Sequence, residues 1–431
     1  KSNIGHTQSA AGMAGLIKLV MAIRHATLPP TPHVENPSEY VDWNSGAMAL
    51  VTRPAPWPET GRPRRGGVSS FGVSGTNAHV LVEQAPEDEP HAEGAETRPV
   101  ALSCPLVPVP VSGASAEALR AQSARLRAHV SAHPDVRLVD LAHSLAHRTS
   151  FSDRAVLLAD GVPRLDELLV TLTSGQDSAD IVSGVAGSPV RPVFVFPGQG
   201  AQWVGMGRGL LTSSPVFADS MNRCAEALAP FTDFDLFEVL DDEDALARVE
   251  VVQPVLWAVM VSLAEVWRAV GVHPVAVIGH SQGEIAAAVV AGALSLSDGA
   301  RVVALRSRAL RALAGAGGMV SVPLPVEEVA SRLGPGLSVA AVNGPESEVV
   351  SGAAEAVEEW LARCEREGVR ARRVAVDYAS HSAQVDLLES ELVEGLAGVR
   401  PESSRVPFYS TVTGGVFDTV GLDGRYWYRN L

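Results

Sequence analysis

Two segments in the second half of the chain share an arrangement that few folds accommodate. Each is an unbroken apolar run ending in a glycine-rich turn, "VRPVFVFPGQG" at 190–200 and "PVAVIGHSQG" at 274–283, and each precedes a helical pattern. Strands buried on both faces of a sheet are continuous apolar runs, because they expose no polar face. A strand, a tight turn and a helix form a βα unit. The sequence therefore predicts an α/β domain with a parallel sheet from residue 190 onward.

A smaller subdomain is predicted inside this domain, at about 319–377. Its pattern is strand, helix, strand, strand, helix, strand, which is the order of a ferredoxin-like subdomain. The insert separates "GHSQG" from "YASH" at 378–381. A site in the cleft between the two subdomains would draw on both ends of the insert.

The first 189 residues divide by composition. Residues 1–85 combine a small-residue helical segment with the alternating strand "AHVLVE". An acidic, proline-bearing stretch typical of a linker follows at 86–100, and a small α/β unit at 101–189. We therefore expect three domains, at 1–85, 86–189 and 190–431.

Charge and cysteine usage exclude several classes of protein. A net charge of −15 disfavours nucleic acid as a partner. No apolar run is expected to span a membrane, and no signal-peptide pattern is visible. Three widely spaced cysteines fit a reducing compartment and give no metal-ligand spacing: Cys104, Cys224 and Cys364. We expect a cytoplasmic chain without a metal, and the start without Met suggests a piece cut from a larger protein.

Ser281 is the candidate nucleophile. It lies between Gly279 and Gly283 at the predicted strand-to-helix turn. Glycines permit a sharp elbow that exposes a hydroxyl at a helix N-terminus, and the N–H of Gln282 then points to where an oxyanion would form. The alternative is a glycine-lined turn with a capping serine, because G-x-S-x-G also occurs by chance.

A nucleophilic serine needs a base, and His381 in "YASH" is the candidate. His6, His79 and His280 are competitors, although His280 is expected to point away from its neighbour Ser281. No acidic residue stands out as a third member. The sequence therefore favours a Ser–His dyad oriented by a backbone carbonyl.

Two further residues would complete a site around Ser281. The glycines around Gln199 in "FPGQG" free its N–H to serve as a second oxyanion donor. Arg306, on the second helix after the elbow strand, would bind a carboxylate with both arms of its guanidinium. The alternatives are an ordinary glycine-rich turn and a surface arginine.

The motifs "FPGQG", "GHSQGE", "ALRSR", "AVNGP" and "YASH", in this order, resemble the acyltransferase domain of modular type I polyketide synthases. Independently, "KSNIGHTQSAAGMAGLIK" and "SSFGVSGTNAHVLVE" resemble the C-terminal end of a ketosynthase, and 86–189 resembles the linker domain between the two. The resemblance implies an α/β-hydrolase-like large subdomain with an inserted ferredoxin-like small subdomain. An α/β linker domain and a partial thiolase-type fold would precede it, and 190–431 would lack the end of its domain.

The resemblance also implies roles for residues of the acyltransferase part. Ser281 would be the nucleophile, His381 its base, and Arg306 the residue that binds the extender carboxylate. The oxyanion hole would use the N–H groups of Gln199 and Gln282, and the backbone carbonyl of Asn430 would orient His381. Residues expected at the substrate pocket are Gln253, Tyr378 and Ser380, with a buried amide bonded to backbone as the alternative for Gln253.

The ketosynthase part is expected to be inactive in this chain. Lys1 and His6 resemble active-site residues of that family, and Phe71 resembles a gating residue. The family's nucleophilic cysteine and first catalytic histidine would lie upstream of residue 1, so no condensation is expected from residues 1–85.

The implied reaction moves a methylmalonyl extender unit from coenzyme A, through acyl-Ser281, to the phosphopantetheine thiol of an acyl carrier protein. "YASH" resembles the methylmalonyl-type signature, and the small Ala379 and Ser380 would leave room for an α-methyl group. Alternatives are a malonyl- or ethylmalonyl-specific enzyme, a serine thioesterase, or a docking scaffold between synthase domains. No bound cofactor is expected. The expected partners are the carrier protein and other domains of the same polypeptide, within a homodimer.

Overall fold

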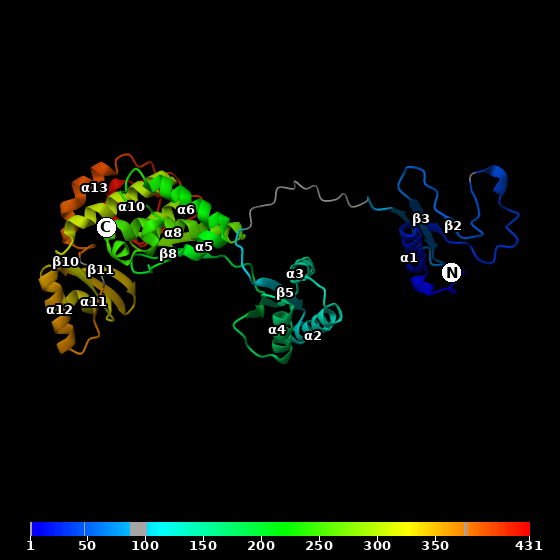
Figure 1. Cartoon of the computed structure of the whole chain (residues 1–431), viewed down its shortest axis with the longest axis horizontal. Coiled ribbons are helices and arrows are strands. Elements are labelled where there is room, and N and C mark those ends of the chain that lie inside the picture. The colour runs from blue at the N-terminus through cyan, green and yellow to red at the C-terminus, as the bar shows by residue number, and fades with distance from the viewer. Residues whose placement is uncertain (1, 47, 87–100, 375, 377) are drawn as a thin grey trace. The chain divides into compact units, whose positions relative to one another are not determined.

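The computed structural model describes residues 2–46, 48–86, 101–374, 376 and 378–431 (Figure 1). The chain forms two compact units, Lys1–Thr97 and Arg98–Leu431. The role suggested for Lys1 falls outside the described residues.

The first unit packs one helix against a hairpin. Strands β3 and β4 pair antiparallel, with Arg65 opposite Glu83 and Phe71 opposite Asn77. Helix α1 lies close against β3 at Gly66, where an added Cβ would lie 2.5 Å from a methyl carbon of Leu19. The elements of this unit are α1 (Ala11–Arg24), β1 (Thr27–Leu28), β2 (Ala55–Pro56), β3 (Arg65–Phe71) and β4 (Asn77–Glu83).

The second unit begins with a three-stranded antiparallel sheet in the order β5-β6-β7. Its core is built from Val and Leu side chains of the strands and of three helices. The sequence predicts the first two strands and the first two helices, and α4 and β7 are additional. The elements are β5 (Val107–Gly113), α2 (Ala116–Ala132), α3 (Leu138–Ala146), β6 (Asp153–Ala159), α4 (Val162–Ser174) and β7 (Ile181–Val185).

The large subdomain is built on a four-stranded sheet in the order β15-β14-β9-β8. The three strands β8, β9 and β14 are parallel, as the two apolar runs predict, and β15 is antiparallel. The strands are β8 (Val193–Phe196), β9 (Ala276–Gly279), β14 (Phe408–Ser410) and β15 (Gly415–Val416). The helices are α5 (Arg208–Ser213), α6 (Pro215–Leu228), α7 (Glu243–Ala247), α8 (Val249–Ala269), α9 (Gly283–Ala291), α10 (Leu296–Leu310), α13 (Glu389–Gly395) and α14 (Gly424–Asn430).

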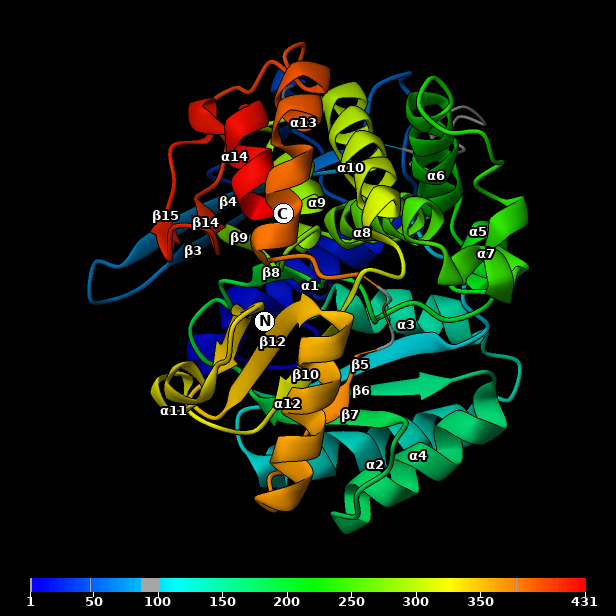
Figure 2. The same ribbon diagram turned by 90° about the vertical axis from the view of Figure 1, so that its left-hand side faces the viewer.

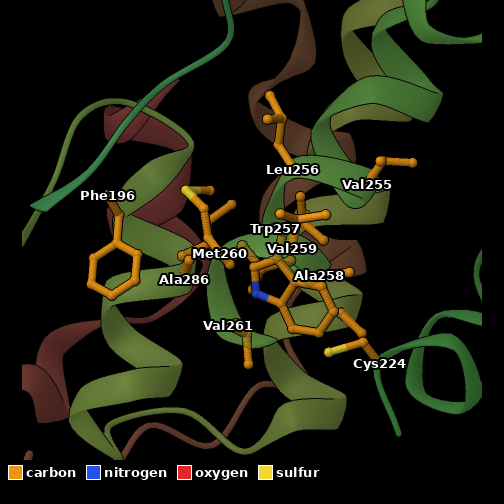
Figure 3. Packing of buried hydrophobic residues seen from close by; sticks show 14 of the residues in the cluster. Phe196, Cys224, Val255, Leu256, Trp257, Ala258, Val259, Met260, Val261 and Ala286 are labelled. Carbon is orange, nitrogen blue, oxygen red and sulfur yellow. The ribbon is translucent and has the colours of Figure 1, made fainter. Parts of the chain in front are cut away.

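Helix α8 forms the centre of the large subdomain's core. Figure 3 shows its side chains at 255–261 between Phe196 at the end of β8 and Cys224 of α6. Contrary to the expectation from the sequence, α8 is long and apolar enough to cross a membrane, with a mean hydropathy of 1.6. However, 78% of that apolar window is buried inside the protein, which is the environment of a core helix.

The small subdomain is the predicted ferredoxin-like insert (Figure 2). Its sheet has the order β11-β12-β10-β13, every pair antiparallel, and packs its apolar face on two helices. The elements are β10 (Gly317–Val322), α11 (Val326–Arg332), β11 (Leu337–Gly344), β12 (Ser347–Ala353), α12 (Ala354–Arg366) and β13 (Arg372–Arg373). The predicted fold class is therefore confirmed.

Candidate active site

Ser281 lies on a sharp turn between β9 and α9. Its backbone is in the left-handed region, with φ of +50°, which costs a non-glycine residue free energy. The flanking glycines are required by close contacts. A Cβ on Gly279 would lie 2.2 Å from the nitrogen of Glu284, and one on Gly283 would lie 2.2 Å from the carbonyl oxygen of Phe196. The turn therefore has the shape of a nucleophile elbow.

We expect Ser281→Gly to be more stable than Ser281→Ala. Both variants lack the hydroxyl, so the difference in their free energy of unfolding isolates the left-handed backbone, which disfavours alanine by about 1 kcal/mol. Urea unfolding measures it. The same two substitutions at Ser331, an exposed position in helix α11, should show the opposite order. There the alanine variant should be more stable than the glycine variant, because alanine favours the helix. Equal or higher stability of Ser281→Ala would contradict a strained elbow.

His381 contacts Ser281 directly, with 3.0 Å between its Nε2 and the serine Oγ. The two residues come from opposite sides of the ferredoxin-like insert. His381 also has a left-handed backbone, with φ of +56°, and its N–H donates to the carbonyl of Leu431 at 2.8 Å. Burial lowers the pKa of His381 to about 3, and the positive charge of Arg306 and the proximity of His280 act in the same direction. The imidazole is therefore neutral at physiological pH and able to accept the serine proton.

The lowered pKa of His381 predicts an unusual pH profile for acylation of Ser281. The base form persists on acidification, so the acylation rate should change by less than about twofold between about pH 8 and about pH 5. An ordinary histidine would lose roughly thirtyfold over this range. Stopped-flow acylation measures the rate, with circular dichroism to verify folding. A fall that follows a pKa near 6.5 would contradict the prediction.

The same shift affects stability with a defined sign. The unfolded chain binds a proton at His381 below about pH 6.5, whereas the folded chain does so only near pH 3. His381 therefore makes the folded state less stable as the pH falls through this window.

Arg306 is buried beside the serine, with 1% of its surface exposed. Its Nη1 donates to Oε1 of Gln253 at 2.9 Å and its Nη2 to Oγ of Ser281 at 3.3 Å. Its Nε is buried without a hydrogen-bond partner among the described residues, and none of their carboxylates forms an ion pair with it. Burial lowers the pKa of Arg306 to about 10, so it remains cationic at neutral pH. A buried cation without a carboxylate is suited to bind an anionic ligand, and the surface-arginine alternative was wrong.

A chain of polar contacts continues from Arg306 across the site. Gln253 donates from Nε2 to Oε1 of Gln199 at 3.2 Å, and the same oxygen accepts from the hydroxyl of Tyr378 at 2.8 Å. Gln253 is buried as the alternative held, but its side-chain amide bonds to the side chains of Arg306 and Gln199 and to no backbone group of the described residues. The side chain of Gln253 therefore holds one arm of Arg306 in place.

The two expected oxyanion donors are available. No hydrogen bond within the described residues uses the backbone N–H of Gln199 or of Gln282. Gln282 caps helix α9, where the first N–H groups have no partner inside the helix. The geometry thus leaves a free donor on each of the two glycine-rich turns.

Asn430 holds the elbow rather than the base. Its Nδ2 donates to the carbonyl of Ser281 at 3.2 Å and to Oε2 of Glu284 at 3.0 Å. Among the described residues, no hydrogen bond joins the Asn430 carbonyl to the ring of His381, so the structure does not show the expected contact. The reason is that Asn430 lies in the last turn of α14, where its side chain faces α9 and the following carbonyl, that of Leu431, reaches His381.

Glu284 is a residue that the sequence analysis missed. It is fully buried beneath the elbow and accepts hydrogen bonds from Tyr426 and Thr411, both at 2.8 Å, and from Asn430. Burial raises the pKa of this carboxyl. A signal was present, because Glu284 is the single charged residue in the apolar helix "GEIAAAVVA". Its carboxyl joins α9 to α14 and to the segment after β14.

A cavity of about 360 Å³ opens at Ser281 and His381, between the two subdomains. One wall is strand β11 at 339–342, and the other carries Thr411 and Arg429. A larger apolar groove of about 700 Å³ follows β8 and includes neither residue of the pair. The chemistry therefore belongs to the smaller cavity.

The small residues of "YASH" have different environments. Ala379 is fully buried, and its Cβ would lie 2.5 Å from a Cβ added to Gly317, so packing on β10 also requires a small side chain here. Ser380 is buried, and its hydroxyl lies 3.5 Å from the sulfur of Met319.

The competing histidines make other contacts. His280 bonds to Asn343, and in the first unit His79 bonds to Ser69 at 2.7 Å. His6, also in the first unit, accepts from the N–H of Gln8 at 3.0 Å. Phe71, at the end of β3, is 72% exposed.

Comparison with known proteins identifies the family. A family model for the acyl transferase domain matches residues 193–431. The C-terminal domain of beta-ketoacyl synthase matches 1–35, and the ketoacyl-synthetase C-terminal extension matches 37–158. The acyltransferase domain from module 8 of the salinomycin polyketide synthase is 50% identical, with a TM-score of 0.72, over 77% of this chain and 81% of that one.

Longer relatives are similar to the chain over its whole length. The spectinabilin polyketide synthase system protein NorA' of Streptomyces orinoci and the polyketide synthase GfsE of Streptomyces halstedii are each 56% identical over 100% of it. The chain spans 12% of the length of each relative. It therefore belongs to the modular polyketide synthases, as an acyltransferase domain that follows the C-terminal end of a ketosynthase.

Proposed function

We propose that this acyltransferase loads a (2S)-methylmalonyl unit from coenzyme A onto the phosphopantetheine thiol of an acyl carrier protein. The observation that carries the proposal is the 3.0 Å contact of the Ser281 hydroxyl with a buried neutral His381, next to the unpaired cation of Arg306. A nucleophile and a carboxylate-binding group side by side suit a substrate that has both a thioester and a free carboxylate.

The reaction proceeds in two half-reactions. His381 takes the proton of Ser281 as Oγ attacks the thioester carbonyl, and the oxyanion accepts from the N–H groups of Gln199 and Gln282. The C–S bond breaks, coenzyme A leaves as a thiol with the proton from His381, and acyl-Ser281 remains. The carrier thiol then attacks this ester, gives its proton through His381 to Oγ, and leaves as the new thioester.

Arg306 selects the substrate by its charge. The free carboxylate of the extender pairs with the guanidinium. This ion pair compensates the buried cation for the hydration that it loses in the protein interior. Gln253 fixes one arm of Arg306, which leaves the unpartnered Nε and the Nη2 beside Ser281 as the donors for the substrate carboxylate. No metal or bound cofactor takes part in this scheme.

The α-methyl preference rests on the "YASH" segment. Tyr378 is held on Gln199 by its hydroxyl, and the two following side chains, Ala379 and Ser380, are small. A methyl group is worth about 1–3 kcal/mol in a pocket, which corresponds to a preference of tenfold to about two hundredfold. We expect the longer protein to act in the cytoplasm as a homodimer, with the carrier protein and further synthase domains as partners.

The test is the intact mass of the chain after mixing with equimolar malonyl- and methylmalonyl-coenzyme A. We expect an acyl-enzyme with the mass of the methylmalonyl ester. A malonyl ester would overturn the extender assignment and keep the enzyme class. Rapid release of free acid with no transfer to an added pantetheine thiol would indicate a thioesterase, and an unmodified chain would indicate a scaffold.

A further inference from the structure

The residue before the nucleophile connects the two subdomains. His280 follows β9 in the large subdomain, and its Nε2 lies 2.8 Å from Oδ1 of Asn343 at the end of β11 in the small subdomain. Because the amide oxygen can only accept, His280 donates from Nε2. His280 and the neighbouring part of β11, at 339–342, line the cavity that contains Ser281. This His280–Asn343 bridge therefore spans the cleft beside the reacting pair.

Local structure prepares Asn343 for this contact. In the ladder between β11 and β12, Val342 is opposite Glu348 and Gly344 is opposite Ser347, so the register shifts at Asn343 and leaves it without a partner. Such a bulge redirects a side chain, and bulges are frequent beside active sites. The irregularity places the Asn343 side chain across the cleft.

His280 is held in place from the other side. Its N–H donates to the carbonyl of Phe196 at 2.8 Å. A Cβ on Gly198 would lie 2.9 Å from Nδ1 of the ring, so the glycine of "FPGQG" gives the imidazole its space. His280 and Asn343 are held by strands of different subdomains. The contact between them therefore depends on how the two subdomains are placed relative to each other.

We propose that the His280–Asn343 bridge positions β11 across the cleft from Ser281 and so decides whether acyl-Ser281 reacts with a thiol or with water. The inference rests on the proposed function. Attack by a thiol gives a thioester and the free Ser281 hydroxyl. Attack by water gives the free carboxylic acid and the same hydroxyl. Val339, Ala340 and Ala341 are half-buried and line the cleft, whereas Val342 and the bridge itself are exposed. A thiol arm that fills the cleft displaces water from the half-buried residues, and the bridge holds this part of β11 in place across from Ser281.

The first experiment uses the full chain with Asn343→Ala, Asn343→Asp, and the exposed Glu346→Ala on the same hairpin as a matched control. Acyl-enzyme is formed with methylmalonyl-coenzyme A and offered N-acetylcysteamine, and thioester and free acid are quantified. In Asn343→Ala the thioester-to-acid ratio should fall about fivefold, the effect of one neutral hydrogen bond, while acylation stays within about twofold. Asn343→Asp keeps an acceptor oxygen and should keep the ratio.

A double variant distinguishes a bridge from two separate effects. If the two side chains act through one bond, His280→Ala/Asn343→Ala should lower the ratio no further than the more damaging single variant. An unchanged ratio in Asn343→Ala, or effects of the two substitutions that multiply, would overturn the proposal.

A second measurement needs no acyl-enzyme. Amide hydrogen exchange at 337–344 should be faster in Asn343→Ala than in the parent chain and unchanged in Glu346→Ala, because the strand opens more often without the bridge. Faster exchange in a chain that cannot be acylated would refute the proposed function and support the bridge. Unchanged exchange would refute the bridge, whatever the activity.

Discussion

Ser281→Ala should leave the chain without any covalent acyl group after incubation with a diacid thioester. The hydroxyl is the atom that forms the ester, and neighbouring groups cannot replace it. His381→Ala keeps the nucleophile but removes its base, so acylation should slow by about 10²–10⁴-fold and still reach completion with time. Intact-protein mass spectrometry over a time course separates the two results.

The control for this experiment is Ser331→Ala, an exposed serine of the small subdomain whose loss should not change the acylation rate. A mass shift that persists in Ser281→Ala would contradict the assignment of the nucleophile. Equal rates in the parent chain and His381→Ala would contradict the role of the base, even though the two side chains are in contact.

Arg306→Ala should abolish the preference for diacid thioesters. Under the proposed function, the substrate carboxylate pairs with a guanidinium that is 1% exposed in the parent chain. Removal of one partner of such a buried charged pair costs about 2–5 kcal/mol, so methylmalonyl transfer should fall by at least thirtyfold relative to propionyl transfer. Competition between methylmalonyl- and propionyl-coenzyme A, read by mass, measures the change.

Two matched variants identify the cause of that loss. Arg308→Ala removes an exposed arginine from the same helix and should leave the selectivity unchanged. Arg306→Lys keeps the positive charge but loses the planar guanidinium that can donate two parallel hydrogen bonds to a carboxylate. The selectivity should therefore lie between those of the parent chain and Arg306→Ala. Unchanged selectivity in Arg306→Ala would contradict carboxylate binding at this residue.

The fold was predictable where the sequence pattern is strong. The apolar runs that precede Gln199 and Ser281 became β8 and β9, and the alternation of strands and helices between them and "YASH" became the ferredoxin-like insert. Strand β14 has only three residues, Phe408–Ser410. Such a short strand has no periodicity of its own and exists because it pairs with β9.

The site was predictable as a set of residue types and less so as a set of contacts. Burial of Arg306 could not be derived from "ALRSR", because the same helix also carries the exposed Arg308 and the half-buried Arg301. The carbonyl of Asn430 was expected to orient His381. In the structure the Asn430 side chain donates to the carbonyl of Ser281, and the carbonyl of Leu431 accepts from the backbone N–H of His381. These pairings join residues more than 40 positions apart, and only tertiary packing decides them.

The insertion between the two reacting residues has a consequence for biosynthesis. Ser281 leaves the ribosome 100 residues before His381 and 149 before Asn430. At about 5–20 residues per second, the nascent chain carries the serine for roughly 5–20 seconds before its base has been made. During this time the hydroxyl has the reactivity of an ordinary alcohol. Under the proposed function, the unfinished polypeptide therefore does not react with cellular thioesters, and acyl transfer starts only after the ferredoxin-like subdomain has emerged.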